Sequence, residues 1–267
     1  MIANSLLASL RRRSSSGAGK KNVVEVGWLL HTDQASFVWQ DPAPVPRAST
    51  SPEHAKAVAY CPAVIDLESR LYQVPCPFDL CLRVKIQDNG EAVLIDTRGD
   101  KSAVIAKTLG TLASFSARKQ WRHSRRPLLQ IRTPYIFLSD DPVYMSQLPP
   151  ILHYKDPPWP GLLVGGRIPI HIWPRLLTWA FEWYDLDKEL ILNRGEPWFY
   201  VRFETADPSS HARLVEAELT PELKRYLAGM SGVVNLVNGT YSLFATARRR
   251  RPTKLLTKVT RESIVTE

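Results

Sequence analysis

Residues 127–138 read PLLQIRTPYIFL and residues 167–173 read RIPIHIW. Both segments show a period of two in apolar residues, which is typical of β-strands, and the second segment places Ile168, Ile170 and Ile172 on one face. Each segment also contains a proline (134 and 169), which lacks the N–H group that a β-ladder uses, so we expect edge or interrupted strands.

Further strand and turn patterns lie on both sides of these two segments. Residues 23–39 are rich in Val, Leu, Phe and Trp and predict one or two strands, and residues 197–204 (PWFYVRFE) predict another, followed by a turn over 207–210. Segment 175–183 is apolar and aromatic and fits a strand or a helix. Asn-Gly within 88–90 accepts the positive φ angles of a tight turn, so we expect a hairpin there.

Helical patterns are fewer. Residues 212–229 predict a late helix, with Thr220 as a natural cap and Pro221 suited to the first turn. Residues 51–59 predict a short helix that Cys61-Pro62 would end.

Many short strands, a late helix and no βα alternation predict a mainly β fold, as a single β-sandwich or jelly-roll-like domain. We place that domain at residues 23–244. A flexible basic N-terminal arm (1–22) precedes it, and a basic C-terminal tail (245–267) follows it.

The charge of the chain is concentrated at its ends. The 267 residues include 35 Lys and Arg against 26 Asp and Glu, with a pI near 9.6. Residues 1–21 hold five basic residues and no acid, and residues 245–267 hold seven basic residues and two acids, so the middle is close to neutral. Basic extremities favour contacts with nucleic acid or an acidic protein surface, and hence an assembly component. No apolar run reaches the roughly 20 residues of a transmembrane helix.

A basic cluster inside the domain, RKQWRHSRR at 118–126, contains a Trp that could stack on a base. A solvated loop is the alternative for this cluster, and a disordered solubilising tail is the alternative for the C-terminal run. The candidate polyanion-binding residues are Arg11, Arg12, Arg13, Arg122, Arg125, Arg126, Arg248, Arg249, Arg250, Arg251 and Lys254.

A resemblance to a known family rests on Cys61-Pro62, on residues 72–80 (YQVPCPFDL), on IRTPY at 131–135 and on RGEPW at 194–198. These Cys-Pro, Thr-Pro and Gly-x-Pro blocks resemble an uncharacterised family associated with bacteriophage genomes, many of them marine. The likeness covers residues 23–204. It implies a viral or prophage setting and no established activity, so no catalytic residue is transferred.

Location follows from the same features. Three cysteines without a paired CxxC pattern suggest reduced thiols, so we expect an intracellular or virion-associated protein. Organelle import is an alternative, because residues 1–21 combine an apolar stretch, arginines and serines without acids.

An enzymatic alternative rests on His31 and Asp33. A His-x-Asp pair with a distal histidine, here His153 or His171, forms the facial triad of Fe(II)-dependent oxygenases, and Arg175 would receive a cosubstrate carboxylate. A three-residue pattern is common by chance, so we leave the cofactor unassigned and prefer a non-enzymatic binding or structural protein.

Two other residue groups have competing interpretations. Trp173, Trp179, Trp183 and Trp198 suit aromatic core packing better than a ligand platform. The carboxylates of Asp140-Asp141, Glu182 and 185–189 offer acid–base or metal chemistry only if they converge, and those at 141–142 and 185–189 are more simply turn residues in solvent.

Overall fold

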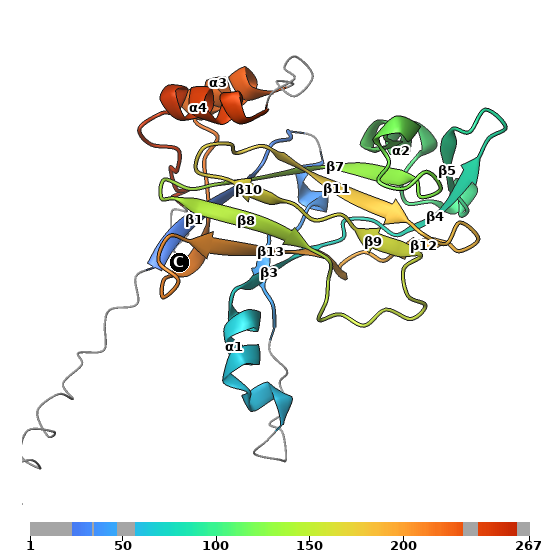
Figure 1. Ribbon diagram of the computed structural model, residues 1–267, viewed down its shortest axis with the longest axis horizontal. Helices are drawn as coiled ribbons and strands as arrows, with labels where there is room; N and C mark the ends of the chain where they lie inside the picture. The colour runs from blue at the N-terminus through green and yellow to red at the C-terminus, as the bar shows by residue number, and fades with distance from the viewer. Residues whose placement is uncertain (1–22, 34, 47–56, 232–239, 261–267) are drawn as a thin grey trace, which may run out of the picture.

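The computed structural model describes residues 23–33, 35–46, 57–231 and 240–260 (Figure 1). The fold is mainly β, as predicted, and its strands form three sheets. In the first sheet the order is β14 (His211–Glu216), β1 (Val23–Leu30), β7 (Leu128–Leu138), β11 (Leu176–Trp183) and β9 (Gly161–Leu163), and β6 (Ala113–Phe115) also pairs with β7.

The second sheet has the order β10 (Arg167–Pro169), β8 (Val143–Leu148), β13 (Pro197–Thr205), β3 (Leu71–Pro75) and β2 (Ala43–Pro44). The third sheet contains β12 (Leu190–Leu192), β4 (Leu80–Ile86) and β5 (Ala92–Asp96). The described helices are α1 (Pro62–Ser69), α2 (Ala106–Leu112), α3 (Pro221–Met230) and α4 (Thr240–Arg250), with short 3-10 turns η1 (Ser36–Val38), η2 (Val58–Tyr60), η3 (Gly99–Lys101) and η4 (Arg118–Gln120). No helix among the described residues has the length and apolarity that a bilayer crossing requires.

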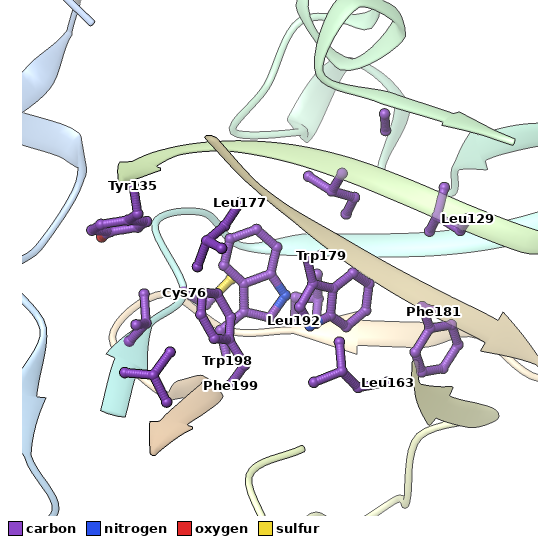
Figure 2. Packing of buried hydrophobic residues seen from close by; sticks show 14 of the residues in the cluster. Cys76, Leu129, Tyr135, Leu163, Leu177, Trp179, Phe181, Leu192, Trp198 and Phe199 are labelled. Atoms are coloured by element: carbon purple, nitrogen blue, oxygen red, sulfur yellow. The ribbon is translucent and has the colours of Figure 1, made fainter. Parts of the chain in front are cut away.

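A core of buried residues from all three sheets lies on one face of β7 (Figure 2). Trp179 and Phe181 stack there with ring centroids 5.1 Å apart, and Trp198 packs against Trp179 at 5.4 Å. Trp183 is also fully buried. The prediction of aromatic core packing is therefore confirmed for these three tryptophans, whereas Trp173 is only half-buried.

A second core lies on the opposite face of the first sheet. Side chains alternate along a strand, so Tyr135 and Phe137 of β7 face the main core while Ile136 and Leu138 face away from it. Helix α3 and residues 251–260 cover Ile136 and Leu138, which is why the C-terminal half of β7 is buried on both faces.

Of the two expectations for Pro134, the edge strand is wrong, because β7 pairs with β1 on one side and β11 on the other, whereas the interrupted strand is confirmed by a shift in the ladder. The ladder between β7 and β11 shifts register between Leu176 and Thr178, opposite Pro134. Thr133 Oγ1 donates to the carbonyl of Leu177 at 3.0 Å, so a side chain supplies a donor where proline has none. Pro169 does end an edge strand, β10, as expected.

The hairpin prediction is confirmed, because β4 and β5 are antiparallel neighbours and Gly90 has a φ of 81°. The predicted helix at 51–59 lies mostly outside the described part, and its described end belongs to the 3-10 turn η2, which stops before Cys61-Pro62. A separate helix begins at Pro62, because proline suits a first helical turn. One helix prediction needs correction. Residues 212–216 form strand β14, because parallel pairing with β1 satisfies their backbone groups.

The boundary drawn at residue 244 falls inside helix α4, and the structure continues against the first sheet up to residue 260. Leu255 and Leu256 are buried there, which the charge pattern of the sequence gave no reason to expect. The predicted N-terminal arm, residues 1–22, lies outside the described residues.

Candidate polyanion-binding surface

Helix α3, helix α4 and residues 251–260 form what we name the helical cap, at one end of the first sheet (Figure 1). Helix α3 begins as the sequence predicted, because Thr220 Oγ1 accepts a hydrogen bond from the Leu223 backbone N–H at 3.2 Å. Leu223 and Tyr226 are buried against the sheet. The intervening Lys224 and Arg225 are exposed on the outer side of the helix.

Residues 251–260 are fastened to the turn after β7 by Asp140. Oδ1 of Asp140 accepts hydrogen bonds from the Leu255 backbone N–H at 2.6 Å and from Arg251 Nη2 at 3.3 Å. The Arg251 guanidinium also donates to the carbonyl of His171 at 2.7 Å. Arg251 is thus held by internal contacts, contrary to its predicted role in polyanion binding, and Asp140 is a structural anchor that the sequence did not reveal.

The preceding arginines of α4 point outward. Arg248, Arg249 and Arg250 are exposed, and so is Lys254. None of the ion pairs between described residues involves these four side chains. Three cations at the C-terminal end of a helix also stabilise it, because they face the negative end of its dipole.

A cavity of about 620 Å³ lies between α3 and α4. Its walls include Trp173, which meets Phe244 edge to face at a centroid distance of 5.0 Å. The Tyr226 hydroxyl lies 2.7 Å from the carbonyl oxygen of Ile172 and 3.0 Å from that of Ala247, so this side chain links α3, α4 and the segment after β10. Burial raises the pKa of Tyr226 to about 12, and the hydroxyl therefore remains a donor at neutral pH.

The other basic cluster, residues 118–126, which we name the basic loop, has a different environment. Arg122 Nη1 and Arg126 Nη1 each lie 3.9 Å from a carboxylate oxygen of Glu182, whose side chain is 5% exposed. The Arg126 guanidinium lies over the ring of Tyr184, 4.6 Å from its centroid. Arg125 is exposed. The sequence allowed Trp121 to stack on a base, but its indole N–H donates to the carbonyl of Ser116 at 2.9 Å.

The basic loop and the helical cap join opposite ends of β7. This strand is 11 residues long and each residue of a strand advances about 3.3 Å, so the two points of attachment are roughly 35 Å apart. Figure 1 shows α3 and α4 at one end of the molecule and α2 with β5, next to the basic loop, at the other. The two clusters therefore do not form one continuous patch.

The N-terminal candidates Arg11, Arg12 and Arg13 lie outside the described residues. Among the residues that the structure describes, no three His, Cys, Asp or Glu side chains gather as a metal site. His31 and Asp33 are exposed.

The distal histidine of the oxygenase hypothesis is held by the backbone. Nδ1 of His171 lies 2.9 Å from the Val143 carbonyl oxygen and 3.2 Å from the Val143 N–H nitrogen. Burial lowers the pKa of His171, and the positive charges of Arg251 and Arg248 lower it further. The other distal candidate, His153, has its Nε2 atom 3.9 Å from Oε2 of Glu196.

Glu196 also forms an ion pair with Lys155, and sequence reasoning did not single out this contact. Burial lowers the pKa of Lys155, whose side chain is 15% exposed. The pair fastens the segment after β8 to the turn before β13. All three cysteines are free, and burial raises the pKa of Cys76 to about 12, so this thiol is not a reactive nucleophile.

Comparison with known proteins adds no assignment: no protein-family model matches this chain, and no curated protein matches it significantly. The helical cap, with its outward arginines and adjoining cavity, is the candidate functional site of the described residues.

Proposed function

We propose that this protein binds nucleic acid in a non-enzymatic role, and that the exposed arginines of the helical cap are its main phosphate contacts. The observation that carries the proposal is that Arg248, Arg249 and Arg250 are exposed together, outside every ion pair between described residues. Guanidinium groups bind phosphate oxygens through paired N–H donors, and each neutralised phosphate releases a counterion.

The cap adds further positive charge to these three arginines. Lys224 and Arg225 of α3 and Lys254 are also exposed, whereas Glu222 is the one acid of α3 itself.

The β body would act as a rigid support for this surface. Buried residues of the first and second sheets share one core, which favours a β-sandwich arrangement. The cap is anchored on the reverse side of the first sheet by Leu223, Tyr226, Leu255 and Leu256. A cationic surface on a rigid base loses little backbone conformational entropy on binding.

The test compares two triple variants of the full-length chain. Arg248→Gln/Arg249→Gln/Arg250→Gln removes three charges from the cap, and Arg118→Gln/Lys119→Gln/Arg125→Gln removes three exposed charges from the basic loop. Binding of labelled 20-nucleotide single-stranded and 20-base-pair DNA is measured by fluorescence anisotropy between 50 and 300 mM NaCl.

The cap variant is expected to bind about tenfold or more weakly near 0.1 M salt, with the slope of log affinity against log salt reduced by about 2 to 3. The loop variant is expected to change affinity by less than about threefold. Equal losses in the two variants, or unchanged binding in the cap variant, would contradict the proposal. Tighter binding to polyglutamate than to DNA would instead identify an acidic protein as the partner.

A truncated chain without residues 1–22 measures separately what Arg11, Arg12 and Arg13 contribute. The cap triple variant should lose affinity by the same factor in this background, because its effect does not depend on the N-terminal segment.

A further inference from the structure

We propose that the cavity between α3 and α4 receives one unstacked base of single-stranded nucleic acid, while the neighbouring phosphates contact the arginines at its rim. This inference rests on the proposed function and adds the class of nucleic acid that the surface selects. It rests on the lining of the cavity, to which Arg250 of the outward run also belongs.

The walls of the cavity suit a planar aromatic ring. Trp173 is half-buried and lines the cavity together with Phe244 of α4, and Leu243 and Met230 add apolar surface. The Arg175 guanidinium lies 5.1 Å from the centroid of the Trp173 ring, so this tryptophan has a cation as well as an aromatic ring among its neighbours. Bases stack on such side chains without strong sequence preference.

The polar groups of the cavity are placed for a charged ligand with an aromatic part. Arg225 of α3 and Arg250 of α4 line it, and both are exposed, so they can reach phosphates outside. Glu222 also lines the cavity, and a carboxylate can accept a hydrogen bond from the exocyclic amino group of a base. Arg251 and Tyr226 line the cavity too but are engaged in the internal hydrogen bonds described above.

The size of the cavity fits the same ligand. A volume of about 620 Å³ lies within the roughly 300–1,000 Å³ of small-ligand sites, so a base with its sugar has enough room. In a duplex the bases are stacked and paired, whereas in a single strand they are free to turn outward. The cavity is therefore expected to favour single strands over duplexes. The exposed arginines alone are not expected to distinguish the two forms.

Gly229 offers a direct way to fill the cavity. It lies on the wall of the cavity within α3, and a Cβ atom built on it meets nothing within 4 Å. Gly229→Leu therefore places a side chain in the cavity without a backbone clash and raises helix propensity. Gly110→Leu in α2 is the matched control, because Gly110 is also an exposed helical glycine with open space around it.

The experiment measures the affinities of full-length wild type, Gly229→Leu and Gly110→Leu for the 20-nucleotide single strand, the matching duplex and a free mononucleotide. We expect Gly229→Leu to weaken single-strand binding by about tenfold and duplex binding by less than twofold, with Gly110→Leu like wild type. Thermal unfolding of both variants checks that the fold is retained.

Unchanged single-strand affinity in Gly229→Leu, or an equal loss for single strand and duplex, would overturn this inference. If a mononucleotide binds as tightly as the strand, the ligand is a free nucleotide and the inference is also wrong. The proposed function is contradicted if the cap triple variant binds both DNA forms as tightly as wild type does. If the cap triple variant loses affinity but Gly229→Leu does not, the proposed function stands and only the cavity inference is wrong.

Discussion

The basic loop and the helical cap each contain a run of basic residues, but these runs have different environments. In the basic loop, Arg122 and Arg126 each lie 3.9 Å from the buried carboxylate of Glu182, near the end of the interior strand β11. In the cap, the side chain of Asp140, which is 36% exposed, pairs only with Arg251, and the three arginines before it stay exposed. In the described part of the chain, the arginines of these two runs that lie close to an acid are paired with it, whereas Arg248, Arg249 and Arg250 stay outside every ion pair.

The position of the anchor explains why only one arginine of the C-terminal run is taken. Asp140 follows β7 directly, so its place is fixed by the most extensively paired strand of the first sheet. It accepts backbone N–H groups of Leu255 and Leu256 as well as the guanidinium of Arg251. Arg250 forms no ion pair with Asp140 or with any other described residue.

Replacing Asp140, which fastens residues 251–260 to the turn after β7, is expected to have the largest effect on stability. Asp140→Asn should lower the free energy of unfolding by about 2 kcal/mol, because an amide loses the charge-assisted hydrogen bonds and presents its own N–H₂ group to other donors. Urea denaturation measures the change. The control is Asp141→Asn, since the Asp141 side chain is exposed and forms no ion pair with a described residue; equal destabilisation by the two variants would contradict the role of Asp140.

Removing the acid beneath the basic loop should make the two regions more alike. Glu182→Gln is expected to raise duplex affinity about two- to threefold at low salt, because Arg122 and Arg126 are then free to turn toward phosphates. Their side chains are 68% and 44% exposed, so they rehydrate and stability should change by less than about 1 kcal/mol. Fluorescence anisotropy measures the gain, and adding Arg122→Gln and Arg126→Gln should abolish it; a gain that persists would show another cause.

The smallest expected change in stability concerns the contact between Glu25 and Lys258, near the end of the described C-terminal segment. Hydrogen bonds from Lys258 and Arg213 lower the pKa of Glu25 below its ordinary value of 4.5. The carboxylate therefore stabilises the fold above that pH, and the contribution is lost as pH falls through the lowered pKa.

Glu25→Gln should lower the free energy of unfolding by about 0.5 kcal/mol at pH 7, since the pair is near the surface, and the difference from wild type should shrink below pH 4.5. Urea denaturation at a series of pH values measures this. Asp88→Asn, at an exposed turn position, is the control. A difference that grows toward acid pH would show that the pair opposes folding.

Local chemistry explains which elements were predictable. Alternation in 197–204 and 127–138, the Asn-Gly turn and the Thr220 cap each depend on residues near one another in the chain, and each is present. The pattern predicts a helix over 212–229, but residues 212–216 belong to strand β14. The sequence pattern misses this strand because its stabilising partner, β1, is nearly two hundred residues earlier in the chain. The sequence pattern identified the exposed arginines of α4. It did not identify the cavity or the role of Asp140, because both depend on contacts between segments that are distant in the sequence.

Composition and pattern alone established a mainly β chain with its positive charge near the ends, because residue type and spacing decide local backbone preference and net charge. Tertiary structure decided which of those charges remain exposed. Asp140, which is partly exposed, holds Arg251 in the cap, and the buried Glu182 lies close to Arg122 and Arg126 in the loop. These contacts depend on the distance between segments far apart in the sequence, which no local pattern encodes.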